Sequence, residues 1–265
     1  METLELRWWL GAILGGAGCG IAGFFLLALD LPFLAVCLAH AALAGAVLGH
    51  LAGFSPMTCA FGGALLAAVI LGPAADRAHV PAATLSGILF SLSLGLAFLG
   101  IGLGGGGRSP AMSLLWGNLL LLDWPRLAAI GTVTGSGAVL AFLFLKEIKA
   151  VLFSRTVAWS CGLPAGIIIY ALITWCGLAI TVNLEAVGGL MLYSLLVNPA
   201  AAARQLTDRF SRALGLAALL AAGSAAGGLM LALQLDWPAG ASIVLVSSAA
   251  FAVAVVIRSL KDQAT

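Results

Sequence analysis

A histidine within an apolar stretch is the side chain of this sequence best suited to chemistry. His40 lies in Cys37-Leu-Ala-His40, and helical spacing sets Val36, Cys37 and His40 on neighbouring positions of one helix face. A neutral imidazole and a thiolate both bind zinc-like ions. His40 is therefore a candidate metal ligand and Cys37 a candidate second ligand. The alternative is a histidine that only packs, with its ring bonded to a neighbouring carbonyl oxygen.

Asn118 is a second polar candidate in apolar surroundings. It follows Trp116-Gly within the stretch Met112–Leu122, which is too short to span a bilayer and is predicted to form a re-entrant or packed half-helix. Polar groups at membrane depth are costly, so each is a functional candidate. Asn118 is predicted either to line a path or to form a hydrogen bond between helices.

A third candidate is the segment that follows an apolar block ending at Pro199. Ala200, Ala201 and Ala203 are small enough for a short helix to seat in a groove of another protein, and Arg204 begins a basic stretch. Such a stretch would complement an acidic rim on that partner. The alternative is a plain amphipathic loop.

These residues must be positioned by membrane-spanning helices. Apolar residues form 62% of the 265-residue chain and charged residues only 8%, whereas an ordinary soluble domain carries about 25% charge. Since one span needs roughly 20 apolar residues, the length allows eight to ten crossings and no sizeable soluble domain. The prediction is a single all-α transmembrane domain over residues 1–265. A self-contained enzyme with its own ATP site is excluded, and no nucleic-acid partner is expected.

Glycine, proline and charged residues divide the chain into apolar blocks. Nine crossings are predicted, although eight or ten remain open. Their ranges are 8–29, 33–53, 56–72, 82–103, 126–146, 160–182, 186–198, 213–235 and 241–258.

The basic residues predict the orientation, because Lys and Arg are retained on the cytoplasmic side. With nine crossings and an outside N-terminus, nine of the twelve basic residues lie inside. Arg7, Arg108 and Arg126 are the other three. The N-terminus is predicted outside and the C-terminus in the cytoplasm.

Three motifs, in this order, resemble the permease subunits of the zinc, manganese and iron ABC importers. The first surrounds the histidine, the second ends in the alanine-rich segment, and the third forms the last outer turn. The matching residues are Leu38-Ala39-His40-Ala41 with Gly45 and Gly49; Val187-Gly188 with Pro199-Ala200-Ala201 and Ala203; and Asp236 with Pro238-Ala239-Gly240 and Ile243-Val244. The resemblance spans nearly the whole chain and implies a fold like that of the type II ABC importers.

The resemblance also implies roles for the candidate residues. In that family the segment after the late proline is the coupling helix that docks on the ATPase, which assigns coupling to Pro199, Ala200, Ala201, Ala203 and Arg204. His40 would be a metal ligand or gate residue on the substrate path. Two family aspartates fall at Val36 and Asn118 in this sequence. Without those carboxylates the cargo could be a softer cation, a less charged complex or a chelate.

The implied function is import of zinc, manganese or iron across the bacterial cytoplasmic (inner) membrane by alternating access. The chain would be a transport subunit without a bound cofactor. Its expected partners are a cytoplasmic ABC ATPase that binds the ATP, a periplasmic or lipid-anchored metal-binding protein, a second copy of the permease, and membrane lipid. Three alternatives remain: a permease for a metal chelate, an ion-coupled secondary transporter, and an intramembrane enzyme. A secondary transporter usually has intramembrane carboxylates, which are nearly absent here. An enzyme needs a nucleophile and a base, and no convincing pair is present.

Overall fold

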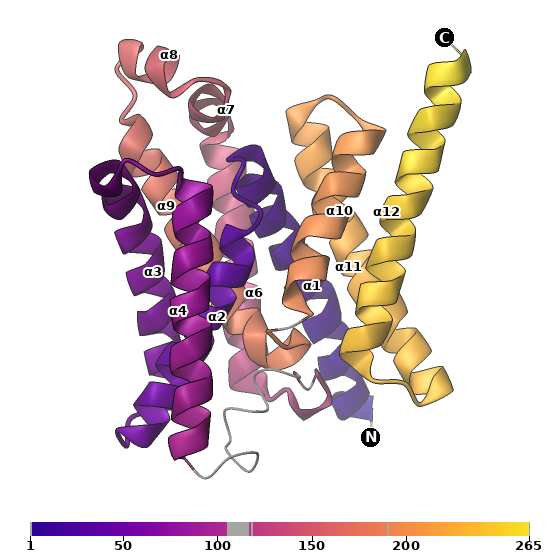
Figure 1. Cartoon of the computed structure of the whole chain (residues 1–265). Coiled ribbons are helices and arrows are strands. Elements are labelled where there is room, and N and C mark those ends of the chain that lie inside the picture. The colour runs from indigo at the N-terminus through magenta and orange to yellow at the C-terminus, as the bar shows by residue number, and fades with distance from the viewer. Residues whose placement is uncertain (1, 105–116, 118, 190, 265) are drawn as a thin grey trace.

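The computed structural model describes residues 2–264 apart from 105–116, 118 and 190. Within this part of the chain the structure consists of helices joined by turns and loops, with no strand, which confirms the all-α prediction (Figure 1). The elements are α1 (Glu2–Ala28), α2 (Leu34–Leu51), α3 (Pro56–Ala78), α4 (Ala82–Leu103), η2 (Leu119–Leu121), α6 (Trp124–Leu143), α7 (Leu145–Phe153), α8 (Arg155–Ser160), α9 (Ala165–Val187), α10 (Leu192–Leu206), α11 (Phe210–Leu235) and α12 (Ala239–Ala264).

Seven helices of the described chain are long and apolar enough to cross a membrane: α1, α2, α4, α6, α9, α11 and α12. In α3 the apolar part is the shorter segment Pro56–Leu71. The 15 residues of α10 extend for roughly 22 Å at 1.5 Å per residue. Each of the nine predicted ranges overlaps one of these nine helices. Whether α3 and α10 also count as crossings stays a prediction.

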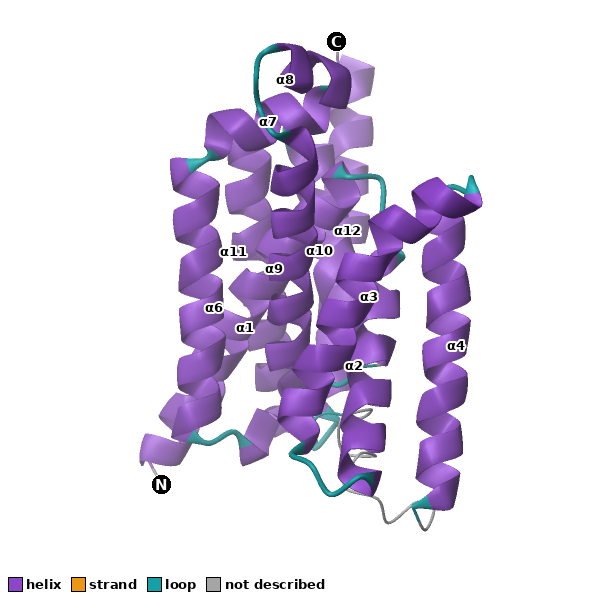
Figure 2. Cartoon of the chain, turned by 90° about the vertical axis from the view of Figure 1, so that its left-hand side faces the viewer, coloured by secondary structure: helices purple, strands orange, loops and turns teal. Residues whose placement is uncertain are grey.

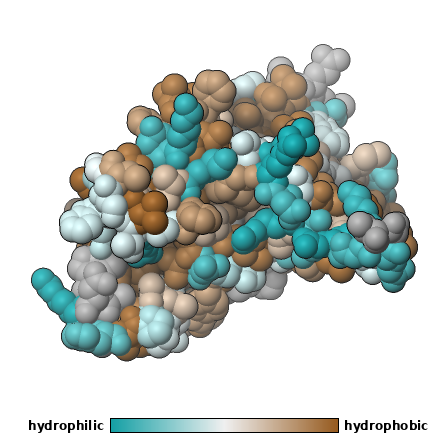
Figure 3. All heavy atoms as spheres, turned by 90° about the horizontal axis from the view of Figure 1, so that it is seen from above, coloured by the Kyte–Doolittle hydropathy of each residue, from teal (hydrophilic) through white to brown (hydrophobic). Residues whose placement is uncertain are grey.

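The N- and C-termini lie at opposite ends of the helix bundle (Figure 1). The short helices α7 and α8 lie across the end that holds the C-terminus, beside the top of α9 (Figure 2). Figure 3 views this end, where groups of hydrophilic side chains stand among apolar ones. The end that holds the C-terminus therefore presents hydrophilic groups at its surface.

The predicted helix end at Pro199 is wrong. Helix α10 runs through Pro199 and continues to Leu206, so residues 200–204 are its second half and not a separate helix. The chain breaks instead after Val187, where Gly188 ends α9 with a φ of 90°. Glycine adopts that conformation without a steric penalty. Proline costs one helical hydrogen bond, and the burial of Pro199, Ala200 and Ala203 inside the bundle offsets this loss.

Helix α1 is the packing centre of one half of the molecule. It packs most extensively on α11 and also on α10, α6 and α9. A Cβ atom at Gly16 or Gly20 would overlap the backbone of α11, and one at Gly23 would overlap the Leu196 carbonyl of α10. Glycine is required at these positions because the helix backbones are in direct contact.

Helix α2 forms a second group with α3 and α4. Gly45 of α2 and Gly63 of α3 face each other, and a Cβ on either residue would overlap the opposite backbone. Helix α9 contacts α1, α2, α3 and α6. It therefore joins the two groups.

The contact at Gly23 provides a test of the packing. Gly23→Ala should destabilise the protein by about 1–3 kcal/mol, the usual cost of overpacking a tight contact, and lower the midpoint of thermal unfolding in detergent. The matched control is Gly87→Ala in α4, where an added Cβ meets no atom within 4 Å. There alanine should raise helix stability by up to about 1 kcal/mol. Equal midpoints for the two variants would contradict the α1–α10 contact.

Candidate functional site

His40 lies inside the bundle on α2, with 5% of its surface exposed. Its Nδ1 atom is 2.9 Å from the Val36 carbonyl oxygen one turn earlier, and its ring meets Phe90 of α4 edge-on at 4.8 Å between centroids. A carbonyl oxygen only accepts, so Nδ1 donates the proton and Nε2 keeps its lone pair. The described part of the chain offers no hydrogen bond to Nε2. The ring is thus packed and oriented through one nitrogen, and the other remains able to bind a metal.

The described residues around His40 do not by themselves complete a metal site. Cys37 is fully buried and Val36 partly exposed. No group of three or more His, Cys, Asp or Glu side chains occurs within the described residues. A transition metal bound at His40 would therefore need further ligands from water, from undescribed residues or from another chain.

Asn118 lies outside the described residues, and its neighbours show only where the segment attaches. Gly117, with a φ of 68°, packs directly against the backbone of Val187 and Gly188. The Leu120 carbonyl accepts a 2.9 Å hydrogen bond from the Trp8 indole. Of the predicted half-helix Met112–Leu122, the described part holds only the short 3-10 turn η2. This segment is anchored between α1 and the end of α9.

Asn183 is a buried polar residue that sequence reasoning missed. Its amide nitrogen donates to the Ala179 carbonyl at 2.8 Å. Its Oδ1 atom is buried against Gly15 of α1 and has no hydrogen-bond partner among the described residues. An unpaired buried acceptor costs about 1–3 kcal/mol. The sequence signal that could have identified it is an amide side chain in the mostly apolar run Ile180-Thr-Val-Asn183-Leu. Its place between α1 and α9 makes it a candidate for a group that gains a partner when these helices move.

The alanine-rich segment is divided between the interior and the surface. Ala200 and Ala203 are fully buried, and Ala201 is partly exposed. The Arg204 side chain is exposed but turns back onto its own chain, where Nη1 donates to the Leu27 carbonyl at 3.3 Å. Leu27 lies in the last turn of α1, at the negative end of the helix dipole, which attracts cations. Its carbonyl also accepts from the Asp30 N–H at 3.2 Å. Arg204 therefore connects the end of α10 to the end of α1.

A second arginine connects the same end of α10 to α12. The Arg258 guanidinium donates to the Arg204 carbonyl oxygen at 3.4 Å. A cavity of about 200 Å³ lies beside this junction, lined in part by Phe24, Arg204 and Phe210. Arg209 and Arg212 are exposed in the following turn and the start of α11. These two arginines, unlike Arg204, have guanidinium groups without a hydrogen bond or ion pair among the described residues.

Comparison with known proteins gives matches over almost the whole chain. The model of the "ABC 3 transport family" matches residues 1–258. The manganese transport system membrane protein MntC of Halalkalibacterium halodurans is 30% identical over 92% of this chain and 83% of its own. The chelated iron transport system membrane protein YfeD of Yersinia pestis is 26% identical over 96% of this chain and 86% of its own.

A solved structure supports the same fold. PsaBC from Streptococcus pneumoniae in complex with Fab superposes with a TM-score of 0.84, at 24% identity, over 95% of this chain and 90% of that chain. The described chain carries seven helices able to span a membrane. The chain therefore belongs to the ABC 3 transport family and is a multi-pass permease of the bacterial cytoplasmic membrane.

Proposed function

We propose that this chain is the permease subunit of an ATP-driven importer for a divalent transition metal, manganese, zinc or iron. The observation that carries the proposal is the family match over residues 1–258, with a 30% identical relative named for manganese transport. ATP is bound and hydrolysed by a separate cytoplasmic ATPase, and a periplasmic or lipid-anchored binding protein delivers the metal. Two copies of the permease form the path and expose it to each side in turn.

The proposed orientation places the C-terminal end of the bundle in the cytoplasm. This end carries α7, α8, the end of α10 and the end of α12 (Figure 1), and these elements contain Lys146, Lys149, Arg155, Arg204 and Arg258. Retention of basic residues in the cytoplasm supports this orientation. The N-terminus then lies outside, and the proposed number of crossings stays nine.

The ATPase is proposed to bind at the surface around the end of α10. Ala201, Arg209 and Arg212 are available to a partner there, whereas Ala200 and Ala203 shape the buried side of the helix. A displacement of the end of α10 by the ATPase would be transmitted to α1 through the hydrogen bond between Arg204 and the Leu27 carbonyl. In this proposal Arg209 and Arg212 supply the charge for docking and Arg204 transmits the movement.

His40 is the proposed transient metal ligand of the path, with Cys37, Val36 and Asn118 as neighbours along it. Its Nδ1 bond to Val36 orients the ring and leaves Nε2 for the metal. By the resemblance, Val36 and Asn118 stand where the family has two aspartates. A bare dication would therefore meet fewer negatively charged ligands along the path. The similarity to a protein named for chelated iron transport favours a metal chelate as the second candidate cargo. The family match argues against an ion-coupled secondary transporter.

The proposal can be tested by reconstitution. The chain is co-expressed with a candidate ATPase and a candidate metal-binding protein from the same genome, and the purified complex is placed in proteoliposomes. Manganese, zinc or iron should accumulate only when ATP and the binding protein are supplied. Uptake that proceeds at the same rate with a hydrolysis-deficient ATPase would contradict an ATP-driven importer.

Two substitutions at His40 distinguish a metal ligand from a residue that only packs. His40→Ala should lower metal uptake by roughly 10–100-fold, the usual effect of losing a metal ligand or its support, while the ATPase still co-purifies. His40→Gln can restore a hydrogen bond to the Val36 carbonyl but not the imidazole Nε2 lone pair, so uptake should remain low. His50→Ala, an exposed histidine at the end of α2, is the control. Normal uptake by His40→Gln would assign His40 to packing alone.

The different roles proposed for Arg204 and Arg212 can also be tested. Arg204→Gln should lower uptake several-fold while the ATPase binds and hydrolyses ATP, because the α10–α1 connection is lost and the docking surface remains. Arg212→Gln removes the same charge from the same end and should weaken ATPase binding instead. If both variants lose ATPase binding equally, Arg204 acts through its charge and not through Leu27.

A further inference from the structure

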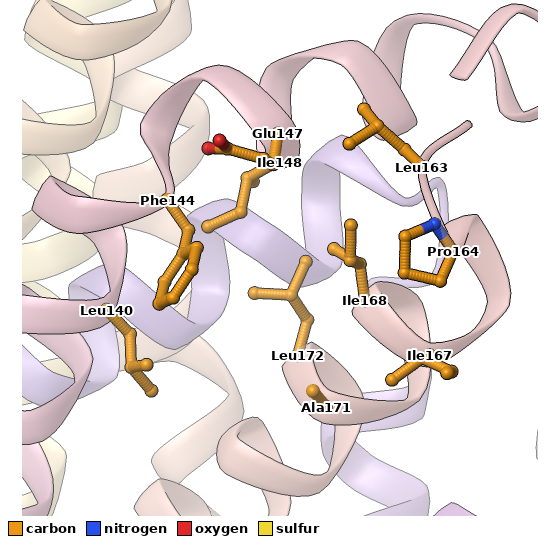
Figure 4. A pocket seen from close by; sticks show the side chains of 10 residues that line it. All are labelled: Leu140, Phe144, Glu147, Ile148, Leu163, Pro164, Ile167, Ile168, Ala171 and Leu172. Carbon is orange, nitrogen blue, oxygen red and sulfur yellow. The ribbon is translucent and has the colours of Figure 1, made fainter. Parts of the chain in front are cut away.

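A groove on the side of the bundle has a lining that no step of transport uses. It has a volume of about 330 Å³ and lies between the end of α6, helix α7 and the start of α9 (Figure 4). This volume is within the range of small-molecule sites, about 300–1,000 Å³. The lining is apolar except for one carboxylate. It consists of Leu140, Phe144, Glu147, Ile148, Leu163, Pro164, Ile167, Ile168, Ala171 and Leu172.

Part of the groove is lined by residues of candidate membrane spans. Leu140 belongs to α6 and Leu172 to α9, and both helices are candidate spans. Ile167 is 71% exposed and Phe144 50% exposed, so the walls face outward from the bundle. A lipid chain fits such a slot. It gains little by leaving the bilayer, however, because lipid tails are as apolar as leucine. Selective binding must therefore come from the polar rim.

The rim carries Glu147, whose carboxylate lies at the edge of the groove beside Phe144 and Ile148 (Figure 4). Glu147 is partly buried and forms no ion pair or hydrogen bond with any described residue. A carboxylate next to an apolar wall is costly unless a cation or donor satisfies it. At the membrane boundary, the ammonium of an aminophospholipid offers both positive charge and N–H donors.

Basic residues on α7 and α8 are candidates to bind the phosphate of the same lipid. Lys146 is exposed on α7 and Arg155 is exposed at the start of α8, and neither pairs with an acidic residue in the described chain. Lys149 points to a different neighbour, since its Nζ lies over the Phe210 ring at 6.0 Å from the centroid. Helix α7 buries Ile148 and Val151 and exposes its lysines, as helices at a membrane surface do. The groove thus has a carboxylate at its rim for an ammonium, and the short helices at this end of the bundle carry two exposed cationic side chains for a phosphate.

We propose that this groove is a binding site for one aminophospholipid molecule. One acyl chain lies between α6 and α9, the ammonium binds Glu147, and the phosphate binds Lys146 or Arg155. The bound lipid bridges the ends of two spans that are otherwise joined here through α7 and α8. The site is separate from His40 and from the end of α10.

The head group provides the test, because phosphatidylethanolamine and phosphatidylcholine with the same acyl chains differ only at the head-group nitrogen, where three N–H donors are replaced by three methyl groups. Native mass spectrometry of the full chain in a detergent containing an equal mixture should show preferential retention of phosphatidylethanolamine. A preference of roughly tenfold is expected for one charge-assisted hydrogen-bonded contact. Glu147→Gln should bring the ratio close to one, and Asp262→Asn, an exposed acidic residue on α12, should leave it unchanged.

Filling the groove distinguishes its apolar part from its rim. Ile168→Trp should reduce retention of both lipids, with normal folding checked by the thermal midpoint. Equal retention of the two lipids by the unaltered chain would overturn the proposal, as would an unchanged preference in Glu147→Gln. A cysteine pair formed between two copies by Ile167→Cys would show that a second chain covers the groove, which also overturns it.

Discussion

The direct contact of helix backbones along α1 is the constraint on which the rest of the structure depends. In a bilayer, burial of apolar side chains gives little drive for helices to associate, because the lipid is as apolar as the side chains. Close packing supplies that drive instead. Gly16, Gly20 and Gly23 let α11 and α10 approach α1 to backbone contact. This arrangement determines where the end of α10 lies, and hence which of its side chains reach the surface.

Polar contacts between helices follow from the same closeness. Thr134 of α6 donates to the Leu14 carbonyl of α1 at 3.0 Å, and a Cβ at Gly18 would overlap that hydroxyl. Arg204 reaches the Leu27 carbonyl only because α10 already touches α1 one turn earlier at Gly23. Each polar group is thus satisfied by a backbone that a small residue leaves accessible. His40 is also satisfied by a backbone carbonyl, but the partner, Val36, lies one turn away on the same helix.

Sequence reasoning predicted the helices well because apolar length is a strong signal in a membrane protein. It placed α4 and α11 nearly at their observed bounds. It failed at Pro199, where a local rule for proline was overruled by burial of the surrounding alanines, and where the true break depended on a glycine with positive φ. It singled out His40 as a polar side chain in an apolar stretch, and that side chain lies inside the bundle, whereas its role as a ligand stays a prediction. It could not find the Arg204–Leu27 contact, because these residues are 177 positions apart in sequence and no pattern links them.

The two helix groups limit the ways in which the permease can change shape. Backbone contact holds α1, α10 and α11 together, and a separate backbone contact holds α2 to α3, so each group resists internal sliding. Helix α9 contacts both groups, and its Asn183 presents an unpaired Oδ1 to Gly15 of α1. A shift of α1 relative to α9 that admits water or a donor would satisfy this oxygen and recover about 1–3 kcal/mol. The contact between α1 and α9 thus includes an acceptor that a shifted arrangement could pair. If coupling at the end of α10 moves α1, as proposed above, the movement would be taken up at this contact. Because His40 belongs to the other group, such a movement would change the position of the candidate ligand relative to α1 without breaking its bond to Val36.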